Sequence, residues 1–273
     1  MHETAGANPS AKRSPWLFFA LVSMLAIPFW VLGFLTRQGF LKDLGINLPI
    51  SALIFLCPAF AAIILVYREE RLGGVARLLR RAFDAGSVRP RVWYVPALLL
   101  LPALYLLSYA LMRRAGVPIP DLHISPLTIL ILFALFFFTA TCEELGWTGY
   151  ALDPLQRRRT ALAAALILGI IWSGVHILPD IQGGQTLGWI AGQRLFSVAL
   201  RVVMVWLYNN AGKSLFAVIL MHAMDNVSVF AIFPGNGGSH YIPAVTAALT
   251  ALVALIITSL WWPKTLAHFR FAR

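Results

Sequence analysis

Residues 124–150 read ISPLTILILFALFFFTATCEELGWTGY, an apolar run that ends shortly after a pair of glutamates, Glu143 and Glu144. The run exceeds the roughly 20 residues that a helix needs to cross the hydrocarbon core of a bilayer. A charged side chain at mid-bilayer costs about 2.5–3.5 kcal/mol on insertion scales, so an intramembrane carboxylate pair indicates a functional site. This stretch therefore predicts a membrane helix that carries chemistry.

The whole chain has the composition of a membrane protein. Of its 273 residues, 59% are hydrophobic and 12% are charged, and the mean hydropathy is +0.77. The charged fraction is about half of the roughly 25% typical of soluble domains, which excludes a soluble enzyme, a disordered chain and a coiled coil. Cys57 and Cys142 lie in apolar runs and indicate neither a disulfide framework nor a cysteine zinc site.

Eight apolar stretches predict eight membrane spans. They cover residues 15–35, 48–67, 92–112, 124–150, 161–178, 188–208, 214–233 and 241–262. No internal repeat or long linker divides the chain. We therefore predict an all-α polytopic membrane protein, with about eight transmembrane helices in one bundle and a single domain over residues 1–273.

The net charge of +11 is interpreted as a topology signal and not as a sign of a nucleic-acid partner. Most Lys and Arg residues lie on the side that holds both termini and the even-numbered loops, which predicts cytoplasmic termini. One of these loops, Arg68–Arg91, contains an amphipathic segment at Gly74–Phe83. We expect this basic segment to lie on anionic lipid headgroups.

Polar residues in the other spans can join the glutamates. His222 and Asn226 are four residues apart and share one helix face. Glu143 and His176 lie on consecutive antiparallel spans, and the midpoint of their numbers falls in the arginine-rich turn between them, so the two side chains reach a similar depth. The sequence thus predicts one cluster of two carboxylates, including Glu144, two imidazoles and one amide.

Three other polar or aromatic residues in the spans have structural interpretations. Asp225 is expected to pair with a nearby base, and Trp172 is expected to be a packing aromatic. Arg201, in the sixth span, is interpreted as a structural counter-ion, with a site for a substrate carboxylate as the alternative.

The motifs around these residues resemble those of the CPBP family of intramembrane proteases, which includes CAAX proteases and bacteriocin-processing proteins. That family is marked by EExxxR, aromatic-xxx-His and His-xxx-Asn on successive membrane helices. The corresponding segments here read EELGWTGY at 143–150, WSGVHILP at 172–179 and HAMDN at 222–226. The resemblance implies an intramembrane endopeptidase whose catalytic core lies within residues 130–230.

One position departs from the family pattern. The arginine four residues after the second glutamate is Thr148 here. An arginine at that spacing would pair with Glu144 along the helix. Without it, Glu144 must be protonated, pair with another cation such as Arg201, or face water. The substitution leaves open that this chain binds its partner without cutting it.

The cluster suits peptide hydrolysis by an activated water molecule. Glu143 is the candidate general base and His176 can orient the water, while His222 and Asn226 can donate hydrogen bonds to the oxyanion. The resemblance implies the same roles, with Glu144 as a further site residue. A zinc ion held by Glu143, His176 and His222 is the alternative, although no HExxH motif is present. We favour the metal-free mechanism and predict no other cofactor.

The predicted function is cleavage of a membrane-embedded peptide or a CAAX-type prenylated protein within the lipid bilayer, in a bacterial-type cell membrane. A catalytically silent relative that acts as a membrane scaffold or a bacteriocin-immunity factor is the first alternative. A proton-coupled transporter that uses Glu143 and Glu144 as a relay is the second.

Overall fold

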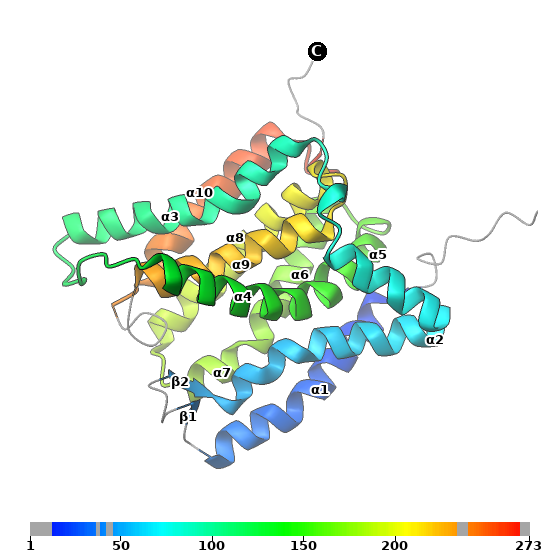
Figure 1. The fold of residues 1–273 in the computed structure, drawn as a ribbon, viewed down its shortest axis with the longest axis horizontal. Helices are drawn as coiled ribbons and strands as arrows, with labels where there is room; N and C mark the ends of the chain where they lie inside the picture. The colour runs from blue at the N-terminus through cyan, green and yellow to red at the C-terminus, as the bar shows by residue number, and fades with distance from the viewer. Residues whose placement is uncertain (1–12, 37–38, 42–45, 234–239, 268–273) are drawn as a thin grey trace, which may run out of the picture.

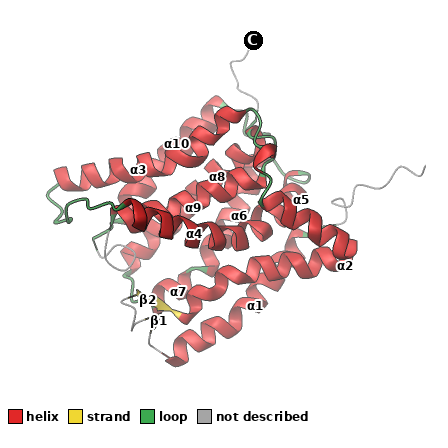
Figure 2. Ribbon diagram, viewed as in Figure 1, coloured by secondary structure: helices red, strands yellow, loops and turns green. Residues whose placement is uncertain are grey.

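The computed structural model describes residues 13–36, 39–41, 46–233 and 240–267, and nearly all of this part is helical (Figures 1 and 2). The α-helices are α1 (Pro15–Thr36), α2 (Leu56–Ala82), α3 (Tyr94–Arg114), α4 (Pro126–Gly146), α5 (Asp153–Gln156), α6 (Ala161–Val175), α7 (Ile177–Gln182), α8 (Leu187–Asn210), α9 (Leu215–Ile232) and α10 (Pro243–Leu260). Short 3-10 helices cover Ile50–Phe55 (η3), Ala85–Ser87 (η4) and Arg91–Trp93 (η5), and a π-helix covers Trp147–Leu152 (η6).

The eight predicted spans are confirmed. Within the described residues, eight helical segments are long and apolar enough to cross a membrane. The all-α fold class is also confirmed. One small feature was not predicted, a two-stranded antiparallel ribbon of β1 (Gly39–Leu41) and β2 (Ile46–Pro49) that follows α1.

Helices α8 and α9 form the centre of the bundle. In their most apolar windows 72% and 67% of the residues are buried, against 28% in α1 at the outside. Helix α8 packs against α6 and α10, and α9 packs against α3 and α4, while α2 covers α4. Polar side chains on α4, α6, α8 and α9 therefore meet inside the bundle, away from lipid.

The second span ends differently from the prediction. Helix α2 continues through the basic segment to Ala82, with a kink at Arg71, where φ is 58°. The chain turns back at this point, so that the part of α2 after Arg71 runs beside the first part (Figure 1). The predicted helix at Gly74–Phe83 is thus largely confirmed, whereas its contact with lipid headgroups stays a prediction.

Polar contacts hold both ends of the described chain at the same end of the bundle. Arg13 donates a hydrogen bond to Glu70 at 2.7 Å. Arg13 and Arg81 both donate to the carbonyl of Gly149. Nearby, at the start of α6, the backbone of Ala161 donates to the carbonyl of Lys264. These contacts agree with termini on one side of the membrane; that this side is cytoplasmic stays a prediction.

Two local features of the backbone position the site. Gly146 lets the end of α4 approach α2 and α1, because a Cβ atom there would lie only 2.6 Å from the carbonyl oxygen of Pro58. The fifth span breaks at His176, between α6 and α7. Pro179 has no N–H for the carbonyl of Val175, so the helix cannot continue unchanged through this point. Figure 1 shows α7 leaving the axis of α6.

Candidate active site

The two glutamates lie in the last turn of α4 and reach separate sets of partners. The exposed fraction is 7% for Glu143 and 0% for Glu144. The next residues form the π-helix η6, and such a local widening of a helix often occurs at functional sites. The site therefore has two halves, one around each carboxylate.

The first half joins α4 to the end of α6. The Oε2 atom of Glu143 accepts a hydrogen bond from the indole Nε1 of Trp172 at 2.6 Å and lies 4.0 Å from Nε2 of His176. The predicted proximity of Glu143 and His176 is confirmed. Nδ1 of His176 lies 2.7 Å from the carbonyl oxygen of Trp172. Because a carbonyl only accepts, Nδ1 is assigned the proton, and in the neutral ring Nε2 is an acceptor beside Glu143.

A small cavity opens beside these two acceptors. Its volume is about 10 Å³, close to the roughly 10–15 Å³ that one water molecule requires. Glu143 and His176 line it together with apolar residues from α1, η3, α2, η6 and α6, namely Val22, Ala26, Ile54, Pro58, Trp147 and Val175. A water molecule placed here would meet a carboxylate and an imidazole in an otherwise apolar chamber.

The second half surrounds Glu144. Its Oε2 atom accepts from Nη1 of Arg201 at 2.8 Å and from the hydroxyl of Thr148 at 2.5 Å. Its Oε1 atom lies 2.9 Å from Nδ1 of His222. Of the three possibilities raised by the sequence, the structure selects a borrowed cation, because Arg201 is paired with Glu144. Its interpretation as a structural counter-ion is thus supported.

Trp172 connects the two halves. Its ring centroid lies 5.7 Å from that of His176 and 5.4 Å from that of His222, and the guanidinium carbon of Arg201 lies 4.4 Å from it. Trp172 is buried in the core, as its interpretation as a packing aromatic predicts, and its indole also donates to Glu143, which was not predicted. The available signal was its position, four residues before His176 and thus on the same helix face.

Replacing Trp172 with Phe is expected to lower kcat of the folded protein about tenfold with little change in KM, because the ring stays but the hydrogen bond to a charged partner is lost. Steady-state kinetics of the peptide cleavage that the motifs predict measures both constants. Trp16→Phe is the control, since Trp16 lies on α1 and is 55% exposed. Equal kcat for the wild type and the Trp172→Phe protein would contradict this role.

The remaining predicted residue, Asn226, lies one turn after His222 on α9. It is partly buried, and no hydrogen bond joins it to another described residue. The neighbouring Asp225 has a different partner from the predicted base: its Oδ1 atom accepts a hydrogen bond from the hydroxyl of Tyr105 at 2.9 Å.

The arrangement does not present the three zinc ligands considered above. Among the described residues, no group of three His, Cys, Asp or Glu side chains is placed to hold a metal ion. The residues therefore do not fit a zinc centre in this arrangement, and no step below uses one.

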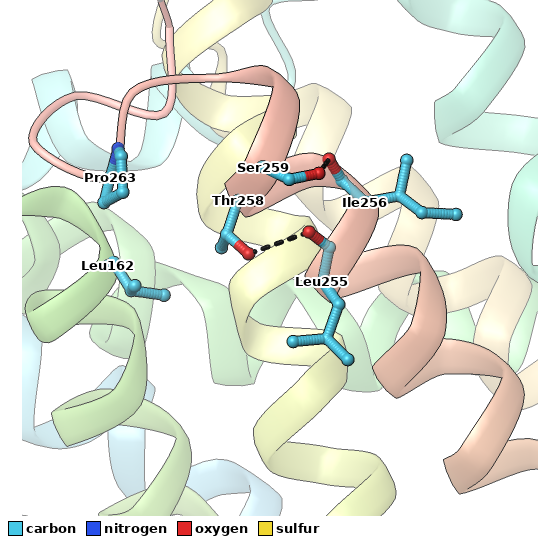
Figure 3. A pocket seen from close by; sticks show the side chains of 6 residues that line it. All are labelled: Leu162, Leu255, Ile256, Thr258, Ser259 and Pro263. Atoms are coloured by element: carbon cyan, nitrogen blue, oxygen red, sulfur yellow. Dashed lines mark hydrogen bonds between the residues drawn. The ribbon is translucent and has the colours of Figure 1, made fainter.

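A larger depression lies elsewhere, between the start of α6 and the end of α10 (Figure 3). Its volume is about 550 Å³, and its lining includes Leu162, Leu255 and Pro263. The two hydroxyls that line it, those of Thr258 and Ser259, donate to carbonyls within α10. The lining holds no acid, base or imidazole, so this depression is no candidate for catalysis.

The fold and the site define a polytopic membrane protein with two buried carboxylates, two imidazoles and an amide inside its helix bundle. Comparison with known proteins gives two findings. Residues 125–228 match the family described as Type II CAAX prenyl endopeptidase Rce1-like. The chain is also 26% identical over 239 residues to CAAX prenyl protease 2 of Methanococcus maripaludis, an alignment that covers 80% of this chain and 85% of that protein.

These findings support the CPBP family for this chain, in agreement with the motifs. They also support protease activity for this chain and, more specifically, intramembrane endopeptidase activity.

Proposed function

We propose that the chain hydrolyses a peptide bond of a membrane-associated substrate by means of a water molecule that Glu143 activates. The observation that carries the proposal is the pair of acceptors, Glu143 Oε2 and His176 Nε2, 4.0 Å apart at a cavity with room for about one water molecule. A water molecule that donates to both acceptors directs its oxygen lone pair away from them, toward a carbonyl carbon.

The proposed reaction has two steps. Glu143 takes a proton from the water as its oxygen bonds to the carbonyl carbon, and the carbonyl oxygen becomes an oxyanion. Glu143 then delivers that proton to the nitrogen as the C–N bond breaks, giving a carboxylic acid and an amine. His176 orients the water throughout.

His222 and Asn226 are the proposed oxyanion donors. The carboxylate of Glu144 can only accept, so Nδ1 of His222 donates to it, and Nε2 is left for the substrate. Nε2 donates when the ring carries both protons, with Glu144 as the counter-charge. One such donor can contribute about 2.7–4 kcal/mol to the stabilisation of the transition state.

The proposed substrate is a CAAX-type prenylated protein or a small hydrophobic peptide. The apolar lining of the chamber suits either class. A peptide is larger than the chamber, so the proposal includes a displacement of α1 or of the η3–α2 segment, which carry Val22, Ala26, Ile54 and Pro58. The named activity of the Methanococcus maripaludis relative favours the prenylated class.

The test is mass spectrometry of prenylated CAAX peptides and unmodified hydrophobic peptides incubated with the purified full chain. We expect new carboxyl and amino termini at one bond, in one of the two peptide classes, and cleavage by the Glu143→Gln protein that is slower by about 100-fold or more. Cleavage by the Glu143→Gln protein at the wild-type rate would refute the mechanism. A wild-type protein that binds these peptides tightly without cutting them would favour the silent scaffold.

Chelators provide a separate prediction. Cleavage is expected to keep its rate after incubation with EDTA or 1,10-phenanthroline, because the proposed steps use only side chains and water. The measurement is the initial rate before and after chelation, with a zinc peptidase treated alongside as a positive control. Inhibition that added Zn²⁺ reverses would contradict the metal-free mechanism.

A further inference from the structure

Arg201 reaches the site from α8 through a close contact with α6. A Cβ atom on Gly169 of α6 would lie 3.1 Å from Cα of Val198 and 3.2 Å from Cβ of Arg201. The absence of a side chain at Gly169 thus lets α8 approach closely at this level. The Arg201 side chain extends from there into the bundle, where its exposed fraction is 0%.

The guanidinium has one ionic partner and one aromatic partner. Nη1 donates to Glu144, and the guanidinium carbon lies 4.4 Å from the centroid of the Trp172 ring. Nε and Nη2 are buried and have no hydrogen-bond partner among the described residues. A planar guanidinium can stack on an aromatic ring and bind a carboxylate at once, which an ammonium group cannot do equally well.

Through these two partners Arg201 contacts both halves of the site. Glu144 accepts a hydrogen bond from Nδ1 of His222, which leaves Nε2 of that ring for a ligand. Trp172 donates a hydrogen bond to Glu143. We propose that Arg201 is a positioning residue that orients Glu143 and His222 together, a role that rests on the proposed function. In this role Arg201 acts through Glu144 and Trp172 and does not touch the substrate.

The chain offers a sharp test because a second position reaches the same carboxylate. The hydroxyl of Thr148 donates to Oε2 of Glu144, the oxygen that Arg201 binds. An arginine at position 148 can therefore replace the lost cation when Arg201 is changed. Arg201→Gln, Arg201→Lys and the double variant Thr148→Arg/Arg201→Gln are compared with the wild type, and Arg113→Gln, a change at an exposed arginine, is the control.

We expect Arg201→Gln to lower kcat of the folded fraction about 100-fold with little change in KM, since Glu144 and Trp172 lose the guanidinium that contacts both of them. The double variant is expected to recover at least tenfold, and Arg201→Lys to be intermediate. If Arg201→Gln does not fold, the other two variants decide the question. Wild-type kcat in Arg201→Gln, an effect on KM alone, or no recovery in a folded double variant would overturn the proposal.

A measurement without substrate separates this inference from the proposed function. The measurement is a double-mutant cycle, in which thermal unfolding in detergent is followed for the wild type, Arg201→Gln, Glu144→Gln and the double variant. We expect Arg201→Gln to lower the unfolding midpoint less when Glu144 is already Gln. Additive midpoint shifts would overturn the pairing even in an active enzyme. Absence of cleavage by the wild type, with a clear coupling in the cycle, would place the fault in the proposed function.

Discussion

Replacing Glu143 with Gln is expected to lower kcat for peptide cleavage by about 10²–10⁴-fold, the range over which general acid–base catalysis contributes. Gln has nearly the same shape, and its carbonyl oxygen can still accept the hydrogen bond from Trp172 that Glu143 accepts at 2.6 Å. It cannot take a proton from water. The loss should therefore appear in kcat, measured by mass spectrometry or with a fluorogenic peptide, while the unfolding midpoint stays close to that of the wild type.

A substitution outside the site controls for the loss of a hydrogen-bonded carboxylate. Glu69 accepts a hydrogen bond from the hydroxyl of Tyr150 at 2.7 Å, among the polar contacts at the end of the bundle. Glu69→Gln should cleave at the wild-type rate. A Glu143→Gln protein that keeps wild-type kcat would sink the proposed mechanism. The transporter hypothesis would be favoured by a different result. In that case neither the Glu69→Gln nor the Glu143→Gln protein cleaves a peptide, and only Glu143→Gln abolishes a pH-driven flux.

Replacing Glu144 with Ala is expected to lower the free energy of unfolding by about 3–5 kcal/mol, because removing one member of a buried ion pair leaves the other charge uncompensated. Arg201 has an exposed fraction of 0% and no second carboxylate within ion-pair distance among the described residues. His222 and Thr148 would also lose their acceptor. Denaturant or thermal unfolding in detergent, followed by tryptophan fluorescence, gives the difference.

Two further variants show whether the effect is electrostatic. Glu144→Ala/Arg201→Met removes both charges and should be more stable than Glu144→Ala alone, since apolar residues often substitute well for a buried pair. Asp121→Ala removes an exposed carboxylate that pairs with Arg113, whose guanidinium lowers the pKa of Asp121, and should leave the midpoint unchanged. A Glu144→Ala protein as stable as Asp121→Ala would contradict the importance of the buried pair.

The proximity of Glu143 to His176 could be predicted because it depends on the chain alone. Two consecutive helices joined by a short turn bring residues equally distant from the turn to the same depth, and the 4.0 Å separation agrees. The spacing of His222 and Asn226 likewise defines one helix face. The motif resemblance identified the same residues, but their catalytic roles remain proposals.

Other features could not be predicted in the same way. The sequence allowed three fates for Glu144, because Thr148 has no charge and Arg201 lies 57 residues away on another helix. The donor role of Trp172 was missed because an indole in an apolar span is usually explained by packing. The turn of α2 at Arg71 was also missed, since a positive φ at a residue other than glycine has no sequence signature here.

Eight membrane helices could be predicted from the sequence, because the length of an apolar run is a local property and a charged side chain is costly in lipid. The cation that neutralises Glu144 could not, because the approach of α8 to α6 at Gly169 and the direction of the Arg201 side chain arise from packing between distant helices. The residues that share a helix face follow from their spacing in the sequence, whereas the residues that they contact on other helices depend on the fold.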